Sequence, residues 1–280
     1  AEGKQVFCPS TPINIVTDFS ITDSDDTGIE FLYIQISSGY DINSDNLELT
    51  GNHPNVNASW DASEGKLTLE SSTSDNEILF ADVENAVKEI VFTSSNINIA
   101  NGRTFSFTVD DKNYLPTTDH FYEFVSAESI TWSQAKTEAE NRTFYGRQGY
   151  LATLTSQEEA DFAGKQASGA GWIGGSDEET EGVWKWVTGP EAGTIFWEGV
   201  VNGSTPNFAF WNDNEPNNAG NEDYAHITDP SIGIRGAWND LPNEGGTGLY
   251  IPRGYIVEYG QPSDPPLNIS SSTSIYLPEI

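Results

Sequence analysis

Hydrophobic and polar positions follow a two-residue period over most of the first 115 residues. Residues 29–36 form an apolar, β-branched and aromatic run, and polar and apolar side chains alternate in 66–70 and 104–109. Clusters of Gly, Pro, Asn and Ser separate the runs, and one short helix is expected near 83–89. Many short strands with turn signals between them are typical of a β-sandwich. The pattern therefore predicts an all-β sandwich domain over residues 1–116.

The pattern changes at about residue 118, where helical periods join the short strands. A stripe of Trp and Ala predicts a helix over 129–141, and residues 155–159 form a capping-box start for a second helix that runs to about 167. Further strands are expected at 120–125, 150–154, 182–187 and 254–259. Residues 118–260 are therefore predicted to form a separate α+β domain.

Between residues 207 and 240 the sequence has little periodicity of either kind. A loop of that length inside a compact domain is usually functional or disordered. Five aromatic residues speak against disorder, namely Phe208, Phe210, Trp211, Tyr224 and Trp238. We therefore expect a long, ordered and functional loop.

The last residues return to the β pattern after a proline-rich stretch. Residues 261–266 are expected to be a linker, and 267–280 alternate again. A lone strand is not stable by itself, so this segment could complete the first β domain, with 118–260 inserted between its two parts. The alternative is that 267–280 begin a third domain.

Acidic residues dominate the charge of the chain. Its 280 residues include 43 acids and 12 bases, which give a formal net charge of −31. Such a chain repels nucleic-acid phosphates and anionic membrane surfaces, and no apolar stretch reaches membrane-spanning length. The simpler interpretation is a surface kept soluble in salty water, and the sharper one is a protein that takes up cations. The two are compatible because salt screens self-repulsion.

The long loop contains three short strings that supply oxygen ligands. They are Glu-Pro-Asn at 215–217, Glu-Asp at 222–223 and Trp-Asn-Asp at 238–240. Calcium is a hard cation that takes about six to eight oxygen ligands. The carboxylates and carboxamides of these strings can form such a cage. If the cage is open to water, the ion can also take ligands from a bound molecule.

Residues from about 120 to 259 resemble the C-type lectin-like domain. Each motif alone is weak, but the set occurs in the family's order and covers half of the chain. The resemblance implies the lectin fold, with two helices, small antiparallel sheets and a long calcium-binding loop. The motifs are Trp132-x-x-Ala135, Leu151-Ala152-Thr153-Leu154, Trp172-Ile173-Gly174-Gly175, and the Glu-Pro-Asn and Trp-Asn-Asp strings.

The resemblance implies a calcium ion at a sugar site and a cis peptide bond before Pro216. Two adjacent sugar hydroxyls would complete the coordination, each accepting a hydrogen bond from an Asn amide and donating one to a Glu carboxylate. The Glu-Pro-Asn order implies a preference for mannose, glucose and fucose over galactose. The implied ligands are Glu215, Asn217, Glu222, Asn239 and Asp240.

An auxiliary calcium site is implied beside the first. It would hold the long loop in the shape that binds sugar, and Asn218 stands where the family commonly has Asp. The implied ligands are Asp177, Glu181, Asn218, Glu222 and Asp223.

The family's two disulfides are absent. Cys8 is the only cysteine, and Ala139, Val257 and Tyr224 stand where the family has cysteines. The loop therefore lacks the disulfide that constrains it in the family, and bound calcium must contribute more to keeping it ordered. We expect calcium removal to disorder roughly residues 212–240.

The first domain resembles the β-sandwich modules of large bacterial repeat adhesins. Residues 23–28 begin like an EF-hand loop, but the twelfth position is Ile34 rather than Glu, so that interpretation fails. An ordinary acidic turn is the alternative to a calcium site here. The expected calcium ligands of this domain are Asp23, Asp25, Asp26, Asp110 and Asp111.

Enzymatic functions are weaker alternatives. Glu215 and Glu222 could form the acid pair of a glycosidase, but acids among Asn residues suit metal ligation better. A cation would also lower the pKa that a general acid needs raised. The three histidines are scattered and no His-Glu-x-x-His motif is present, so a zinc enzyme is not expected.

The sequence therefore predicts a calcium-dependent carbohydrate-binding module of a bacterial surface adhesin, secreted or at the cell surface. It would bind fucose-, mannose- or glucose-type glycans without catalysis and attach to cells or biofilm, with neighbouring adhesin modules as further partners. The alternative is a protein-binding or structural adhesin tip in which calcium only stiffens the loop.

Overall fold

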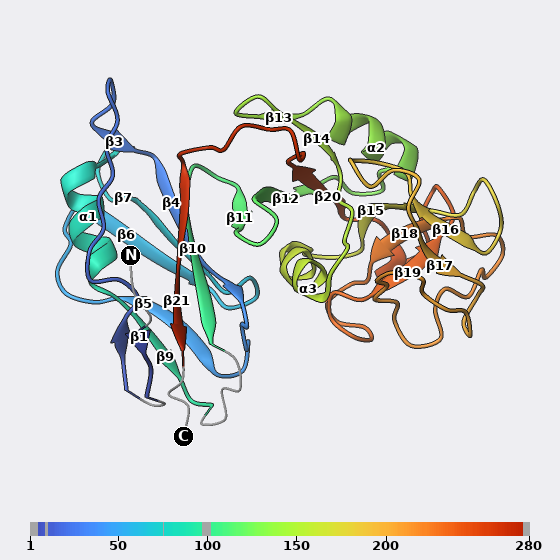
Figure 1. Cartoon of the computed structure of the whole chain (residues 1–280), viewed down its shortest axis with the longest axis horizontal. Helices are drawn as coiled ribbons and strands as arrows, with labels where there is room; N and C mark the ends of the chain where they lie inside the picture. Colours follow the sequence, from blue (N-terminus) through green and yellow to red (C-terminus); the bar gives the residue numbers. More distant parts are fainter. Residues whose placement is uncertain (1–4, 9–10, 75, 97–101, 277–280) are drawn as a thin grey trace. The chain divides into compact units, whose positions relative to one another are not determined.

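The computed structural model describes residues 5–8, 11–74, 76–96 and 102–276 (Figure 1). The chain divides into two compact units, each with its own hydrophobic core. The first, the β unit, comprises Ala1–Thr118 and Leu267–Ile280. The second, the inserted unit, comprises Asp119–Pro266.

The described part of the β unit consists of short, mostly antiparallel strands and one helix. Its six-stranded sheet has the order β1 (Gln5–Val6), β21 (Ser270–Tyr276), β10 (Arg103–Val109), β4 (Phe31–Ser38), β7 (Lys66–Ser71) and β6 (Val56–Asp61). A three-stranded sheet has the order β2 (Ile13–Asn14), β9 (Ile90–Ser94) and β5 (Asp45–Leu49). The remaining elements are the pair β3 (Gly28–Ile29) and β8 (Ile78–Leu79), helix α1 (Phe80–Lys88) and β11 (Asn113–Leu115).

The two sheets of the β unit share one core. The rings of Phe92 in β9 and Phe105 in β10 meet edge to face, with centroids 5.4 Å apart, although they belong to different sheets. Ile34 and Ile36 of β4 are fully buried in the same cluster. Burial of each such side chain contributes about 1.5–3 kcal/mol. The unit is therefore a β-sandwich, as the two-residue period predicts.

Strand β21 comes from the segment that follows the inserted unit. It lies antiparallel to β10, with Arg103 opposite Ile275 and Phe107 opposite Ser271. On its other side it pairs in parallel with β1. The large sheet therefore contains an internal strand supplied by the last part of the chain.

The inserted unit contains two helices and several short strands. The elements are β12 (His120–Ser126), α2 (Trp132–Glu140), β13 (Thr143–Phe144), β14 (Arg147–Leu151), α3 (Gln157–Gln166), β15 (Gly171–Ser176), β16 (Val183–Trp186), β17 (Ile195–Glu198), β18 (Tyr224–Ile227), β19 (Trp238–Leu241), the 3-10 helix η1 (Gly248–Tyr250) and β20 (Gly254–Tyr259). Strand β20 pairs antiparallel with β12 and β14 and parallel with β15. Strand β15 also pairs with β16 and β18, β16 with β17, and β18 with β19.

The segment 207–240 is more regular than its sequence pattern predicts. It contains β18 and β19, which pair antiparallel. Every residue of both strands is buried, so neither shows the alternation that marks a half-buried strand. This explains why periodicity alone does not find them.

Two tryptophans fasten the start of helix α2 to strand β15. Trp132 donates its Nε1 hydrogen to the carbonyl of Ile173, and Trp172 donates its own to the carbonyl of Ile130, both at 2.9 Å. Both indoles are almost fully buried. A buried indole N–H needs an acceptor, and each tryptophan here finds one across the unit.

The two helix starts differ from the predicted capping. Helix α2 has a complete capping box between Thr131 and Gln134. At helix α3, Ser156 accepts a hydrogen bond from the Glu159 amide at 3.2 Å. The Glu159 carboxylate, however, accepts from the amide and hydroxyl of Thr155, at 2.7 and 2.9 Å. The predicted box is therefore only half formed, because Glu159 belongs to a different network.

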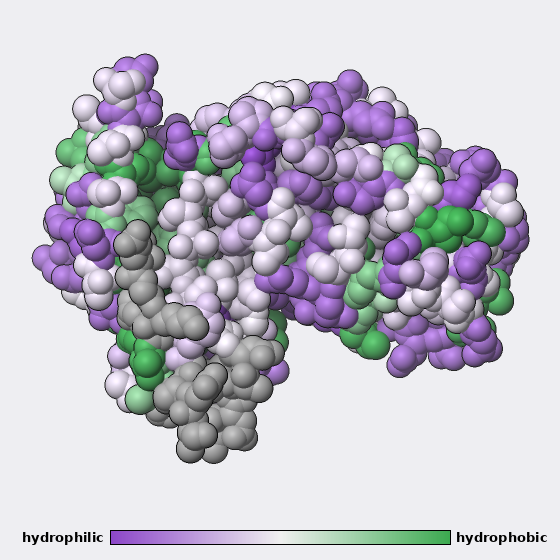
Figure 2. All heavy atoms as spheres, viewed as in Figure 1, coloured by the Kyte–Doolittle hydropathy of each residue, from purple (hydrophilic) through white to green (hydrophobic). Residues whose placement is uncertain are grey.

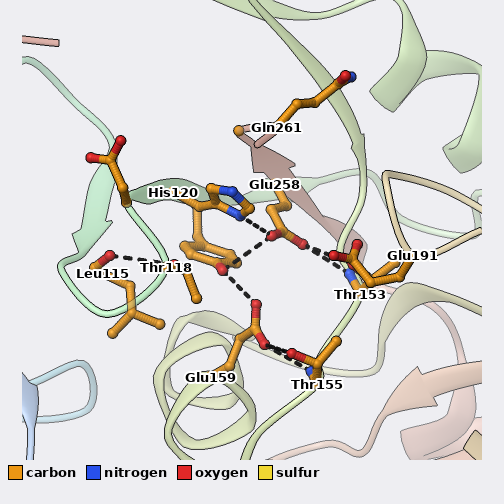
Figure 3. A network of polar contacts seen from close by, with 12 residues as sticks. Leu115, Thr118, His120, Thr153, Thr155, Glu159, Glu191, Glu258 and Gln261 are labelled. Atoms are coloured by element: carbon orange, nitrogen blue, oxygen red, sulfur yellow. Dashed lines mark hydrogen bonds and ion pairs between the residues drawn. The ribbon is translucent and has the colours of Figure 1, made fainter. Parts of the chain in front are cut away.

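That network joins strands β12 and β20 to helix α3 in the interior of the inserted unit (Figure 3). The Tyr122 hydroxyl lies 2.7 Å from Glu159 Oε1 and 3.2 Å from Glu258 Oε1. Glu258 also contacts His120 Nδ1 at 2.6 Å and accepts from the Thr153 amide at 2.9 Å. Burial and the charge of Glu258 raise the pKa of Glu159 to about 7. The network holds two buried carboxyl groups around one hydroxyl.

Arg147 holds the two ends of the inserted unit together. Its side chain is 2% exposed, and its guanidinium pairs with Asp119 Oδ2 at 3.0 Å and donates to the carbonyl of Pro265 at 3.1 Å. It also lies over the ring of Phe121. Because one side chain contacts both ends, the ends of the unit lie close together, which is what insertion into another domain requires.

The molecular surface is mainly polar. The face in Figure 2 is largely hydrophilic, with small separate hydrophobic patches. Among the described residues, eight Lys and Arg side chains form ion pairs with carboxylates. Most of the twelve basic side chains of the chain are therefore already paired. Among the described residues, no helix is long and apolar enough to cross a membrane.

Candidate calcium and carbohydrate site

The ligand strings at 215–217 and 238–240 meet at Asp240. The Glu215–Pro216 peptide bond is cis, as the resemblance implies. The amides of Asn217 and Asn218 donate to the two oxygens of Asp240, at 3.1 and 2.8 Å. Asp240 itself is 1% exposed on β19. One buried carboxylate therefore fixes the backbone of the turn against the strand.

The side chains of this cluster are already hydrogen-bonded to one another or to the loop. Asn217 Nδ2 donates to Glu215 Oε2 at 2.5 Å, and Asn239 Oδ1 accepts from the amide of Asp240 at 3.0 Å. Glu222 Oε2 accepts from the amide of Ala219 at 3.0 Å. The cluster thus combines three carboxylates with two carboxamides, the donor chemistry that suits calcium.

Negative charge is crowded at this point. Burial and the neighbouring Asp240 raise the pKa of Glu215 to about 8. The same two causes raise the pKa of Glu222 to about 7, and burial raises the pKa of Asp240. The carboxylates repel one another in a partly buried environment, where water screens their charges less. A cation bound among them would relieve that repulsion.

The residues of the implied auxiliary site also approach one another. Asp177 is 2% exposed and accepts from the Gly182 amide through Oδ2 at 2.8 Å, while its buried Oδ1 has no hydrogen-bond partner. Its own amide donates to the carbonyl of Asp223 at 3.2 Å. Burial first, and then the charges of Glu181, Asp223 and Asp240, raise the pKa of Asp177 to about 7. A buried carboxylate oxygen without a partner fits a cation ligand.

Asn218 and Glu222 link the two implied sites. The Glu222 amide donates to Asn218 Oδ1 at 2.8 Å. Asn221 Nδ2 donates to Asp223 Oδ2 at 2.9 Å. Residues 218–223 therefore form a compact turn that contacts Asp240 through the amide of Asn218 and Asp177 through the carbonyl of Asp223.

Carboxylates alone do not make a metal site in this structure. Within the described ranges, no group of three or more His, Cys, Asp or Glu side chains is arranged to hold a metal ion. In the long loop, carboxamide oxygens would have to complete the coordination. Glu222 would also have to leave the amide of Ala219.

The five aspartates expected to bind calcium in the β unit are not gathered into such a group either. Asp23 Oδ1 accepts from the amides of Asp25 and Asp26, at 3.1 and 3.4 Å. Asp110 accepts from the amide of Asp111, which pairs with Lys112. These contacts are those of ordinary acidic turns, the alternative considered for this segment, and a calcium site formed by the five aspartates stays a prediction.

Of the two tryptophans beside the ligand strings, Trp238 belongs to the core and Trp211 is half-buried against it. Trp238 is fully buried and meets Trp186 and Trp211 edge to face, at centroid distances of 5.5 and 5.9 Å. Trp211 also contacts Phe196. Because Trp238 is fully buried, neither face of its ring is free to stack on a sugar. Its packing against Trp186 and Trp211 instead holds in place the strand that carries Asn239 and Asp240.

Comparison with known families defines the class of the inserted unit. The family model described as "Lectin C-type domain" matches residues 128–243. The matched range includes both helices of the unit, strands β15 to β19 and all the ligand strings. This part of the chain is a C-type lectin domain, and the resemblance drawn from its motifs is confirmed.

Individual relatives extend the comparison. The chain is 38% identical over 253 residues to Halomucin of Haloquadratum walsbyi, covering 86% of this chain and 3% of that protein. It is 31% identical over 126 residues to the hepatic lectin of Gallus gallus, covering 42% of this chain and 47% of that protein. The chain thus spans less than half of the length of either relative. The Halomucin alignment is longer than the inserted unit and so continues into the β unit.

Solved structures of the same class are also similar. One is the cow C-type carbohydrate-recognition domain of CD23, crystallised in the presence of a GlcNAc2Man3 oligosaccharide. It is 26% identical, with 50% of this chain and 86% of that chain covered and a TM-score of 0.35.

Proposed function

We propose that the inserted unit binds carbohydrate through a calcium ion. The observation that carries the proposal is the junction of the Glu-Pro-Asn turn with Asp240, which brings carboxylates and carboxamides of two distant strings to one point. The membership of this segment in the C-type lectin domain family supports it. The proposed ligands are Glu215, Asn217, Glu222, Asn239 and Asp240.

Four of the five ligand residues have two tasks in this proposal, because they contact both the ion and the sugar. Bound calcium supplies a site at which two sugar hydroxyls can coordinate. Glu215 and Glu222 accept hydrogen bonds from those hydroxyls, and the amide groups of Asn217 and Asn239 donate to them. Asn217 Nδ2 already donates to Glu215, so its amide plane is oriented before any sugar arrives. Preorganised donors lower the entropy cost of binding.

The auxiliary ion would order the loop rather than contact the sugar. Its proposed ligands lie on the β15–β16 connection and on the turn before β18, so an ion between them would tie these segments together. The unpartnered Oδ1 of Asp177 supports this role. The proposed ligands are Asp177, Glu181, Asn218, Glu222 and Asp223.

A glycosidase remains the weaker candidate. The raised pKa values of Glu215 and Glu222 would suit a general acid. However, they arise from burial among other carboxylates, and a cation at the same point would reverse them. C-type lectin domains are generally non-enzymatic, so we propose binding without chemistry.

The sugar class follows from the order of the Glu-Pro-Asn turn. We propose ligands with the hydroxyl pair of mannose, glucose or fucose. Affinity for one monosaccharide is expected to be weak, about millimolar to tens of micromolar, since few atoms make contact. Many copies acting together would convert this into firm attachment. Secretion or display on a cell surface, in an adhesin that attaches to cells or biofilm, is the setting we propose.

A glycan array tests the proposal. It would be probed with the intact chain in calcium and again after addition of a chelator. We expect fucose- or mannose-type signals that disappear with the chelator. Calcium-dependent loop ordering without any glycan signal would favour a protein-binding or structural tip instead.

The double variant Glu215→Gln with Asn217→Asp tests the hydroxyl pairing. It exchanges an acceptor and a donor between the two positions while it keeps the number of charges constant. Preference should move toward galactose. An unchanged preference would count against the pairing.

A further inference from the structure

Asn212 contacts three separate segments around the candidate site. Its amide donates to the carbonyl of Trp238 at 2.8 Å, directly before Asn239 on β19. Its carbonyl accepts from the amide of Glu215 at 3.1 Å. Its side-chain Oδ1 accepts from the amide of Ile234 at 3.1 Å, in the connection between β18 and β19. The same Oδ1 accepts from the amide of Asp213 at 3.0 Å.

The backbone around Asn212 is shaped to receive its side chain. Gly233 has a φ of +63°, and a Cβ atom added there would lie 2.0 Å from Asn212 Nδ2. Only glycine leaves room for the carboxamide and adopts that conformation without strain. The adjacent Trp211 and Trp238 form an isolated parallel β-bridge, which places the backbone of Asn212 beside the ligand strand.

From these contacts we infer that Asn212 is a positioning residue for the calcium and carbohydrate site. It touches neither ion nor sugar in the proposed function, on which this inference rests. It sets the separation between Glu215 on one string and Asn239 and Asp240 on the other. It also fastens the 229–236 connection to the base of the turn.

In this role Asn212 compensates for the missing disulfide of the loop. The loop has no cysteine, so its two ligand strings are joined only by non-covalent contacts. Asp240 makes the contact on the ligand side, through the amides of Asn217 and Asn218. Asn212 makes it on the opposite side, through one backbone bridge and one side-chain oxygen. The two contacts bracket the Glu-Pro-Asn turn from both ends.

The test compares Asn212→Ala with Asn212→Asp in the full chain. Aspartate keeps the acceptor oxygen for Ile234 and Asp213, whereas alanine removes it. Loss of one such hydrogen bond corresponds to about a 2- to 13-fold change in an equilibrium constant. We expect calcium titrations to show binding weakened by about that factor in Asn212→Ala. Asn212→Asp should bind at least as tightly as the wild type.

A matched control separates positioning from general destabilisation. Thr131 Oγ1 accepts from the Gln134 amide at 3.2 Å, a similar bond at the start of helix α2 and far along the chain from the ligand strings. Thr131→Ala should lower the melting temperature without changing calcium affinity. Hydrogen exchange in calcium-free protein gives a second readout, because the amides of Ile234 and Glu215 should exchange faster only in Asn212→Ala.

The outcomes are separable from those of the proposed function. A wild type that binds no calcium refutes the proposed function itself. A wild type that binds calcium together with an Asn212→Ala variant of equal affinity and unchanged Ile234 exchange overturns the positioning role. Gly233→Ala should mimic Asn212→Ala by displacing the carboxamide. If it weakens calcium binding no more than Thr131→Ala does, the inference is likewise wrong.

Discussion

Replacement of Glu159 by Gln should remove a pH dependence from the stability of the inserted unit. Glu159 is 2% exposed and shares the hydroxyl of Tyr122 with Glu258. Burial and the charge of Glu258 raise its pKa from 4.5 to about 7. The native protein therefore holds a proton that the unfolded chain releases between these two pH values.

The sign and the size of the effect follow from proton linkage. Between about pH 4.5 and 7 the native state binds more protons than the unfolded state, so stability falls as pH rises. A pKa difference of about 2.5 corresponds to about 3 kcal/mol, as an order of magnitude. The pKa of His120 is also raised, by its hydrogen bond to Glu258 against the opposing effect of burial. Its contribution has the same direction but persists in the variant.

Tryptophan fluorescence during denaturant unfolding measures this effect. Seven of the eight tryptophans lie in the inserted unit, so the signal reports mainly on that unit. Calcium is kept saturating, so that the ligand carboxylates do not add their own titration. We expect the wild type to lose stability between pH 5 and pH 8 relative to Glu159→Gln. Parallel pH profiles for the two proteins would refute the shared-proton network.

Three further predictions concern metal, fold and salt. Chelation of calcium should increase hydrogen exchange in 212–240 while the buried strand β20 stays protected; exchange that is unchanged in the loop would show that calcium does not order it. Arg147→Ala should destabilise the inserted unit by about 2 kcal/mol, because Asp119 and Pro265 lose their common partner. As a control, Lys136→Ala removes only the exposed ion pair with Glu140, and the unfolding midpoint should change little. Sodium chloride should raise the melting temperature, since a net charge of −31 is screened; a melting temperature that falls with salt would contradict this.

Alternation alone predicts a strand with one exposed face but not a fully buried one. Strand β7 alternates as expected, with Leu67 and Leu69 buried and Glu70 exposed. Strands β18 and β19 lie within one unbroken aperiodic segment because both of their faces are covered. Helix α1 begins at Phe80 rather than near Val83, since its first turn has no side-chain cap to mark it.

Candidate ligands can be found from sequence because their types are unusual, whereas their supports cannot. Glu215 and Asp240 belong to short strings rich in oxygen donors. Asn212 has no such signal in the sequence. Its partners are backbone amides and carbonyls, which every residue type except proline carries, so no residue pattern marks them. The network of Tyr122, Glu159 and Glu258 is equally hidden, because it joins positions that only the folded sheet brings together.

The most direct test of the account is a crystal structure of the chain grown in saturating calcium with a methyl mannoside. We predict one ion bound by Glu215, Asn217, Glu222, Asn239 and Asp240, with two neighbouring hydroxyls of the saccharide as its remaining ligands. Protein groups closing that position, or no ion there at saturating calcium, would contradict the account.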